Sequence, residues 1–233
     1  MRISKIDIDH WLGGELGNPA YRIELDAGDD TRLPEELKNA GAFAYTKIAA
    51  DSISESDYLQ NIGFRLVDTL VTLQRRVKNI GTDTSGVEFA VAADANDVGS
   101  LAHGAFSLTR FHLDPLIPTE TANKIKENWA RNFFSGKRGD YMVVAREAGH
   151  VTGFLQLLLS SNGVLTIDLV AVAANSKGNG IAEKMTTFAE QEIKGVKTLN
   201  VGTQVSNTAS LRAYTKMGFR PVGAQYIWHY HQT

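Results

Sequence analysis

The chain has 233 residues, of which 43% are hydrophobic and 21% charged, with a formal net charge of -2. This balance is ordinary for a globular protein, and the lack of a basic excess argues against a nucleic-acid partner. The absence of cysteine excludes disulfides, thiolate metal sites and cysteine nucleophiles. The start of the chain lacks the apolar core of a signal peptide, and apolar stretches such as 164–174 are far shorter than the ~20 residues that span a bilayer. We therefore expect a cytoplasmic protein without membrane insertion.

Apolar periodicity and turn residues predict the elements of the chain in order. In the first part we expect a strand at 2–8, a short helix at 34–39, a strand at 42–49, a helix at 54–62 and a strand at 64–73. The polar segment 77–86 has no periodicity, which predicts a linker. Beyond it we expect helices at 95–103 and 119–134, strands at 141–146, 151–159 and 165–172, a helix at 180–193, a strand at 198–203, a helix at 207–217, and closing strands at 219–222 and 226–231.

These elements indicate an α+β (mixed α/β) protein with an N-terminal domain at 1–76, a linker at 77–86 and a second domain at 87–233. Residues 59–67 (LQNIGFRLV) also align without gaps with residues 214–222 (YTKMGFRPV). In both segments a helix ends at a glycine and a strand follows. Either this is a common joint, or the N-terminal region is a truncated relative of the C-terminal fold. In the second case it is a substrate-side or scaffolding piece, because it has no glycine-rich loop.

The most informative stretch joins the apolar strand at 165–172 to a glycine-rich turn and then to a helix. In this layout the N–H groups of the turn and the positive end of the helix dipole point to one place, which favours a phosphate ligand. Glycine permits close approach to the backbone. The spacing Lys-x-x-Gly-x-Ala is neither a Walker A loop nor a dinucleotide fingerprint. If the turn binds a phosphate, the binding residues are Lys177, Gly178, Asn179, Gly180, Ile181 and Ala182. The alternative is that the turn has only a structural role.

A second motif begins at Asn207, which follows a predicted strand and can cap the next helix by accepting a hydrogen bond from an N–H of its first turn. Leu211, Tyr214 and Gly218 are spaced at i, i+3 and i+7, on one face of that helix. Taken alone, this motif is as consistent with a core tyrosine whose hydroxyl lies at the edge as with a functional one.

In this order, the two motifs resemble the signature of the GNAT superfamily of coenzyme A-dependent N-acyltransferases. The first motif of the family, Arg/Gln-x-x-Gly-x-Gly/Ala, is matched except that Lys177 keeps the charge of the first residue but not the planar fork of arginine. The second, Asn-x-x-(Ala/Ser)-x-x-x-Tyr-x-x-x-Gly-Phe, is matched throughout at Asn207, Ser210, Tyr214, Gly218 and Phe219. The resemblance covers about residues 87–233. It implies the GNAT fold, a central mixed sheet flanked by helices, with acetyl-CoA as the co-substrate.

Segments along almost the whole chain resemble a narrower group, the dTDP-4-amino-4,6-dideoxygalactose (dTDP-fucosamine) N-acetyltransferases; they are 46–50, 59–68, 105–106 with 110–111, and 201–204 with 207–211. This resemblance implies direct attack, in a ternary complex, by the primary amine of a nucleotide-linked (dTDP or UDP) amino-deoxy sugar, for surface polysaccharide biosynthesis. The alternatives are a GNAT enzyme with another amine acceptor, such as an aminoglycoside, a polyamine or a protein N-terminus, and a non-catalytic acyl-CoA-binding module.

The superfamily resemblance also implies roles for single residues. Val170 and Val172 would pair with the pantetheine arm along a splayed strand, and Asn207 would hydrogen-bond that arm. The diphosphate would bind at the turn 177–182. Tyr214 would be the general acid for the departing thiolate. A tyrosine suits this role because its ordinary pKa of about 10 keeps it protonated at neutral pH.

The base has two candidates in the sequence. Asp68 lies in an otherwise apolar predicted strand, and the amino-sugar enzymes carry an acidic residue matched to it. Asp168 shares strand parity with Val170 and Val172, and should face the cofactor side unless a bulge intervenes. The plain alternatives are a solvated carboxylate for Asp68 and a structural hydrogen-bonding role for Asp168. Either residue can also act through a water molecule.

On the acceptor side, Arg110 can grip a nucleotide diphosphate in a bidentate manner and Phe111 can stack on its base. The alternative is that both are plain loop residues. Trp129 and Asn132 can face the same cleft; the alternative is that Trp129 anchors its helix. We expect no metal, because His103, His112 and His150 have no metal-ligand spacing, and because no carboxylate lies near His229 and His231 in the sequence. A homodimer is compatible with the sequence.

Overall fold

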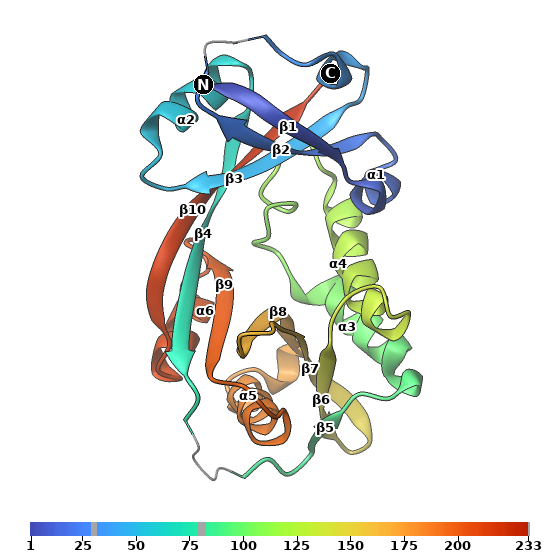
Figure 1. Cartoon of the computed structure of the whole chain (residues 1–233). Coiled ribbons are helices and arrows are strands. Elements are labelled where there is room, and N and C mark those ends of the chain that lie inside the picture. Colours follow the sequence, from blue (N-terminus) through green and yellow to red (C-terminus); the bar gives the residue numbers. More distant parts are fainter. Residues whose placement is uncertain (29–31, 79–82, 233) are drawn as a thin grey trace.

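The computed structural model describes residues 1–28, 32–78 and 83–232. Its described strands form one mixed sheet in the order β1-β2-β3-β10-β4-β9-β8-β7-β6-β5 (Figure 1). The strands are β1 (Arg2–Ile8), β2 (Ala20–Asp26), β3 (Phe43–Ala49), β4 (Arg65–Arg76), β5 (Val87–Phe89), β6 (Tyr141–Glu147), β7 (His150–Leu159), β8 (Val164–Val172), β9 (Thr198–Gln204) and β10 (Arg220–His231). The mixed α/β class expected from the sequence is confirmed.

Six α-helices and three short 3-10 helices complete the described part of the chain. The α-helices are α1 (His10–Leu16), α2 (Ile53–Asn61), α3 (Ala95–Ala105), α4 (Thr119–Phe134), α5 (Ile181–Glu192) and α6 (Thr208–Lys216). The 3-10 helices are η1 (Glu35–Lys38), η2 (Ala92–Asp94) and η3 (Ala174–Ser176). None of the described helices is long and apolar enough to span a bilayer.

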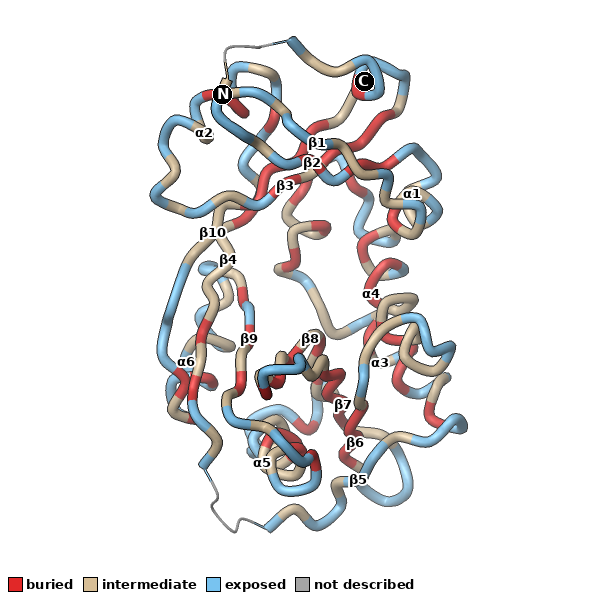
Figure 2. The backbone as a smooth tube through the Cα atoms, in the orientation of Figure 1, coloured by how far each residue is buried: buried red, intermediate tan, exposed pale blue. Residues whose placement is uncertain are grey.

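Helices cover both faces of the sheet around β6 and β7. Val143 packs in one cluster with Met185 of α5, whereas the adjacent Met142 and Val144 pack with Ala102 of α3. Because successive side chains of a strand point to opposite faces, β6 is apolar at consecutive positions rather than at alternate ones. Consecutive buried residues therefore occur in both β6 and β7 (Figure 2).

Two observations alter the expected order of elements. The closing strands predicted at 219–222 and 226–231 are wrong as separate strands, because a bulge between Pro221 and Gly223 lets β10 continue as one strand. In addition, α1 and β2 were not expected from the sequence. Asp9 caps α1 by accepting a hydrogen bond from the Leu12 N–H, and β2 pairs with β1 and β3.

The sheet continues across the predicted linker 77–86, of which residues 79–82 lie outside the described residues. β4 belongs to the predicted N-terminal domain, yet it pairs antiparallel with both β9 and β10 of the predicted second domain. The two predicted domains thus share one sheet in the described chain, and a division between them remains a prediction.

The sequence echo is part of a longer structural repeat. β3, α2 and β4 begin at residues 43, 53 and 65, and β9, α6 and β10 begin at 198, 208 and 220, with the same lengths and the same spacing. The strand pairing obeys the same relation, since Ala49 pairs with Gln225 and the equivalent Gln204 pairs with Leu70. Each copy supplies one of two neighbouring strands, β4 and β10, so a pseudo-two-fold axis runs between them. The N-terminal region is therefore a partial copy of the C-terminal fold.

The neighbouring strands β8 and β9 separate along their length. Their parallel pairing runs from Val164 with Thr198 to Ile167 with Val201 and then stops, although β8 continues to Val172 and β9 to Gln204. Beyond the last pair the two strands leave a V-shaped opening in the sheet, with unpaired backbone groups on the β9-facing edge of β8.

Candidate active site

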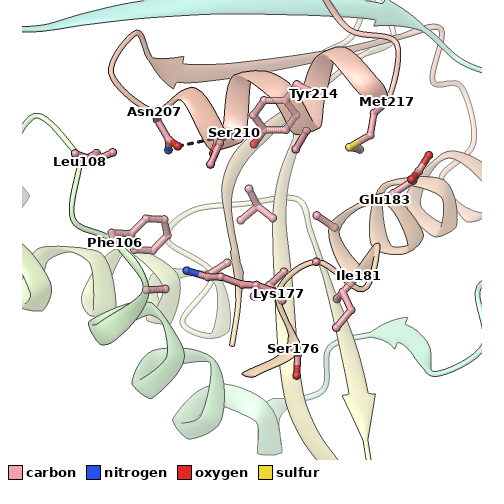
Figure 3. A pocket seen from close by; sticks show the side chains of 18 of the residues that line it. Phe106, Leu108, Ser176, Lys177, Ile181, Glu183, Asn207, Ser210, Tyr214 and Met217 are labelled. Atoms are coloured by element: carbon pink, nitrogen blue, oxygen red, sulfur yellow. Dashed lines mark hydrogen bonds between the residues drawn. The ribbon is translucent and has the colours of Figure 1, made fainter. Parts of the chain in front are cut away.

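The opening between β8 and β9 leads into a cavity of about 500 Å³, here called the first cavity (Figure 3). Its walls come from the end of β8, the turn before α5, the first turns of α6 and the loop after α3. Of the residues predicted to bind a cofactor, it is lined by Val170, Val172, Lys177, Gly178, Gly180, Ile181, Ala182 and Asn207. Tyr214 lines it as well, so the two sequence motifs form opposite walls of one site.

The glycine-rich turn is shaped to accept a ligand close to the backbone. Gly178 and Gly180 have φ angles of 85° and 74°, which side-chain-bearing residues rarely adopt. No atom lies within 4 Å of a Cβ placed on either glycine, so their exposed faces adjoin open space. No side chain caps the N-terminus of the 12-residue helix α5, which leaves its first N–H groups available to an anion. Asn179 is the one predicted residue of the turn that does not line the cavity.

The wall formed by α6 carries two polar groups. The Asn207 side-chain oxygen accepts a hydrogen bond from the Ser210 N–H at 3.1 Å, which confirms its role as the helix cap. Tyr214 is only 7% exposed, and its ring packs edge-on against Phe219 at 5.6 Å. Burial raises the pKa of the Tyr214 hydroxyl well above its ordinary value. This hydroxyl therefore holds its proton at neutral pH and can act as a donor.

A second cavity of about 340 Å³ adjoins the first, since Thr109 lines the first and the next residue, Arg110, lines the second. Its walls are α1 with its capping residue Asp9, β3, the loop after α3, α4 and the segment after α4. The lining residues are Asp9, Trp11, Leu12, Tyr45, Arg110, Trp129, Asn132, Lys137 and Arg138. Trp129 and Asn132 thus face this cleft, as the sequence allowed.

Arg110 is held in the second cavity by two rings and a histidine. Its guanidinium carbon lies 4.1 Å from the centroid of the Tyr45 ring and 4.4 Å from that of Phe111. Its Nη1 donates to Nε2 of His229 at 3.2 Å. Burial lowers the pKa of Arg110 to about 10, so the guanidinium stays charged at neutral pH. No described carboxylate forms an ion pair with it.

Behind Arg110, two histidines share one carboxylate. Asp114 accepts hydrogen bonds from Nδ1 of His229 at 2.6 Å and from Nε2 of His231 at 2.7 Å. Because arginine can only donate, His229 must accept from Arg110 at Nε2 and carry its proton on Nδ1. Burial lowers the pKa of His229 to about 4, so this imidazole is neutral. The nitrogen and carboxylate atoms of this group converge within 4.8 Å, but hydrogen bonds already occupy both nitrogens of His229. That no metal binds remains a prediction.

Basic groups outnumber free carboxylates around the second cavity. The charges of Arg110 and Arg138 act on both Lys47 and Lys126, and the acidic groups that act on these cations are Asp9, Asp68 and Asp168. Partial burial, together with the positive charge of Arg110, lowers the pKa of Lys47. Among the residues that line the cavity, Arg110, Lys137 and Arg138 are basic and Asp9 is the one acidic residue, so the lining carries an excess of positive charge. Of these cations, Arg110 is the one to which the sequence assigns a binding role.

The carboxylate of Asp168 is occupied by hydrogen bonds from three neighbouring side chains. It accepts hydrogen bonds from Nε of Arg138 at 2.7 Å, from Trp129 at 2.8 Å and from Gln156 at 3.3 Å. A bulge intervenes at Asp168, since Gln156 and Leu157 pair with the residues on either side of it, Leu169 and Ile167. The strand parity that made Asp168 a candidate base therefore does not hold at this position, and its contacts favour a structural role.

Asp68 lies on β4 between the two cavities and is 6% exposed. Burial raises the pKa of its carboxyl group, although hydrogen bonds from the Thr69 N–H and the Gln204 side chain oppose that rise. Its Oδ2 makes no hydrogen bond within the described structure. Gln204 lines the first cavity and Arg110, whose charge acts on Asp68, lines the second. A buried carboxylate oxygen without a donor is suited to accept a proton or bind an amine.

Phe111 does not reach either cavity. Its ring is 1% exposed and packs with Ile125, Phe43 and the guanidinium of Arg110. The geometry gives this residue a supporting position beneath Arg110, with no free face for a nucleotide base. The adjacent Arg110 is the residue of this pair that faces the cleft.

The separated strands, the open glycine turn before α5 and the buried tyrosine hydroxyl form the arrangement that the two sequence motifs predict for an acyltransferase. Residues 108–219 match the acetyltransferase (GNAT) family. The chain is also 30% identical over 185 residues to dTDP-fucosamine acetyltransferase of Escherichia coli O6:H1, and the alignment covers 79% of each chain. The chain belongs to the acetyltransferase (GNAT) family, and the resemblance seen in its two motifs is confirmed.

Two further comparisons agree with this assignment. The chain is 33% identical over 138 residues to the spore coat polysaccharide biosynthesis protein SpsD of Bacillus subtilis (strain 168). That match covers 58% of this chain and 47% of SpsD, so the chain spans about half the length of this relative. A tandem GNAT protein from the clavulanic acid biosynthesis pathway is similar in structure, with a TM-score of 0.60 and 11% identity over 93% of this chain and 76% of that one. At this identity the likeness concerns the fold alone.

Proposed function

We propose that this enzyme transfers an acetyl group from acetyl-CoA to the primary amine of a nucleotide-linked amino-deoxy sugar, a dTDP or UDP derivative. The amine attacks directly within a ternary complex, and the product serves surface polysaccharide biosynthesis in the cytoplasm. One observation carries this proposal: the first cavity, with its phosphate-accepting turn, adjoins a second cavity in which positive charge is in excess. The names of the two relatives, an amino-sugar acetyltransferase and a spore coat polysaccharide biosynthesis protein, support it.

In this proposal the first cavity holds the acetyl donor. The backbone of residues 178–182 and the charge of Lys177 hold the diphosphate, because the turn offers N–H groups and open space. The unpaired edge of β8 at Val170 and Val172 pairs with the amide groups of pantetheine. Asn207 uses its side-chain oxygen for the helix cap, which leaves its amide nitrogen to donate to the same arm.

The two proton transfers are assigned to residues on opposite sides of the reacting atoms. Tyr214 donates a proton to the departing thiolate, since burial keeps its hydroxyl protonated. Asp68 accepts the proton that the amine loses, directly or through a water molecule, because its Oδ2 has no other partner. The raised pKa of Asp68 makes it a better base than an ordinary aspartate.

The second cavity holds the nucleotide part of the acceptor. Arg110 presents a charged fork without a carboxylate partner, and Arg138 and Lys137 lie on the same cavity. A positive site attracts a phosphate-bearing acceptor and repels polyamines and aminoglycosides, which are cations at neutral pH.

Thiol release from acetyl-CoA, measured against a panel of acceptors, tests the proposal. The panel contains dTDP- and UDP-linked amino sugars, an aminoglycoside, a polyamine and a peptide with a free N-terminus. We expect turnover with at least one nucleotide-linked amino sugar and little with the others. Turnover confined to the simple amines would refute the acceptor assignment, and absence of acetyl-CoA binding by calorimetry would refute the donor assignment.

A further inference from the structure

Lys126 places a buried amine in the wall between the two cavities. This α4 residue is 9% exposed, and its Nζ lies 4.5 Å from the ring centroid of Trp129, 5.5 Å from that of Phe106 and 5.8 Å from that of Phe111. Phe106 lines the first cavity and Trp129 the second. The amine makes no hydrogen bond or ion pair with any residue that the structure describes. A buried lysine in this state lacks the counter-charge that such a group normally has.

The groups that face Lys126 are mostly positive. They come from every element packed around it: Arg110 and His112 on the preceding loop, Lys47 on β3, Arg138 on the segment after α4, and Asp168 on β8. The single carboxylate among them, Asp168, is held by Arg138, Trp129 and Gln156. Burial, and then the charge of Arg110, lowers the pKa of Lys126 to about 7. About half of the lysine side chains are therefore neutral at pH 7, and the ammonium becomes more favourable when negative charge arrives from outside the protein.

We propose that Lys126 is the buried counter-charge for the phosphate groups of the acceptor, and that it takes up a proton from solvent when they bind in the second cavity. This inference rests on the proposed function, because it takes the acceptor to be a nucleoside diphosphate sugar. The phosphates neutralise the surrounding cations, so the cost of charging the amine falls. The three aromatic faces then stabilise the ammonium. Binding of the acceptor is thereby coupled to pH, whereas binding of a neutral amine is not.

The sign of the effect follows from the direction of the shift. Binding raises the pKa of Lys126 above its value of about 7 in the free protein. The contribution of its charge to affinity is complete below the free pKa and is lost as the pH rises through the bound pKa. Between these values the dissociation constant increases with pH by at most about tenfold per pH unit.

Calorimetric titration with dTDP-glucose measures this proton directly. This sugar nucleotide has no amine to acetylate, and its diphosphate lacks the terminal phosphate monoester that titrates near pH 6. The protein is first saturated with coenzyme A, so that the titrant does not enter the first cavity. Titrations at pH 7 in buffers of different ionisation enthalpy give the number of protons taken up. With a free pKa of about 7, we expect about half a proton per site, rising towards one at pH 8.

Two substitutions distinguish the effect of the positive charge at position 126 from the effect of its protonation. Lys126→Arg keeps a cation that does not titrate near neutral pH, so we expect binding without proton uptake and with little pH dependence. Lys126→Met replaces the amine by an apolar side chain of similar shape, so we expect an unchanged or raised melting temperature and about tenfold weaker binding of dTDP-glucose at pH 6. Lys124→Met, on the same helix but with a half-exposed side chain, is the control and should behave like the unsubstituted protein.

The inference is overturned if dTDP-glucose binds without proton uptake. It is also overturned if the Lys126→Arg variant takes up as many protons as the unsubstituted protein, because the protons would then belong to another group such as His112. Either result leaves the proposed function intact provided that nucleotide-linked amino sugars are still acetylated. Conversely, if no such sugar is acetylated but proton uptake is seen, the acceptor assignment fails and the anion site at Lys126 stands.

Discussion

Tyr214 lines the first cavity, and its hydroxyl group is not engaged by another side chain of the described structure. The structure shows no hydrogen bond between it and a described residue, and burial keeps it protonated. We expect Tyr214→Phe to lower kcat by about 10²–10⁴-fold, the usual range for loss of a general acid, with little change in the Kd for acetyl-CoA. Thiol release and calorimetry measure the two quantities. Unchanged turnover would show that the thiolate leaves without this donor and would favour a non-catalytic role for the motif.

The raised pKa of Asp68 predicts a pH dependence of both activity and stability. As a base it must be ionised, so activity should fall as the pH drops through a pKa above the ordinary aspartate value. Asp68→Asn should remove this limb of the pH profile and lower kcat by about 10²–10⁴-fold. A pH–rate profile with an unchanged acid limb in this variant would exclude Asp68 as the base.

The same raised pKa of Asp68 makes the fold more stable at low pH, where the activity is expected to fall. A carboxyl group that binds its proton more tightly when folded stabilises the protein at low pH, and this contribution is lost as the pH rises through the folded pKa. At neutral pH the charged Asp68 therefore destabilises the fold. We expect Asp68→Asn to raise the melting temperature at pH 7 and to have less effect at pH 4, as thermal unfolding would show. A lower melting temperature at pH 7 would contradict the assigned direction.

At the scale of elements, Asp114 connects the loop after α3 to β10 by accepting hydrogen bonds from His229 and His231. Asp114 fixes the proton of His229 on Nδ1, so that Nε2 accepts from Arg110. Asp114→Asn weakens this restraint, and we expect a rise of about tenfold in the KM for the nucleotide sugar, with kcat and the KM for acetyl-CoA nearly unchanged. Asp97→Asn, at an exposed position of α3, is the matched control. A fall in kcat without a change in this KM would show that the chain of hydrogen bonds does not position Arg110.

A second link joins β4 to α5 through Arg75 and Glu190. Two hydrogen bonds of 2.5 and 2.8 Å connect the side chains, which are 6% and 7% exposed. Glu190→Gln leaves the guanidinium buried without its counter-charge, so we expect a loss of about 3–5 kcal/mol in the free energy of unfolding. Denaturant titration measures this loss. A change below about 1 kcal/mol would mean that solvent reaches the pair.

How far the sequence predicts an element depends on how local its signals are. The turn at 177–182 and the helix begun by Asn207 were predicted because a strand, a glycine turn and a cap lie next to one another in the chain. α1 was missed because Gly13 and Gly14 conceal its periodicity, although Asp9 is a recognisable cap. β2 was not predicted, although Tyr21, Ile23 and Leu25 alternate with polar residues and the turn residues 17–19 precede the strand.

The second cavity shows the corresponding limit for the site. Its residues come from α1, β3, α4 and two connecting segments, and only the paired sheet brings these together. Arg110 could be selected from its type and position, but Lys126 resembles an ordinary helix lysine in the sequence. Phe111 was given a role beside Arg110, and only burial shows that its ring supports the neighbouring guanidinium.

At the scale of the whole molecule, the shared sheet predicts the behaviour of fragments. A fragment of residues 83–233 lacks β4, and both β9 and β10 then lose a strand partner in the middle of the sheet. We expect this fragment to show no cooperative thermal unfolding, and to regain acetyltransferase activity when refolded together with residues 1–78. Circular dichroism and thiol release test these outcomes. Cooperative unfolding of residues 83–233 alone would support the domain boundary expected from the sequence.

The pseudo-two-fold axis between β4 and β10 has a consequence for how the enzyme behaves in dilute solution. In a symmetric dimer, an equivalent seam would form between separate molecules and would open as the concentration falls. Here both sides of the seam belong to one chain, so its closure is intramolecular and independent of concentration. Among the described residues, the N-terminal copy has no counterpart of the glycine turn that precedes α5, so the expected stoichiometry is one donor molecule per chain. The N-terminal copy supplies β3 and β4, which carry Lys47 and Asp68 and hold them beside the proposed acceptor site at any dilution.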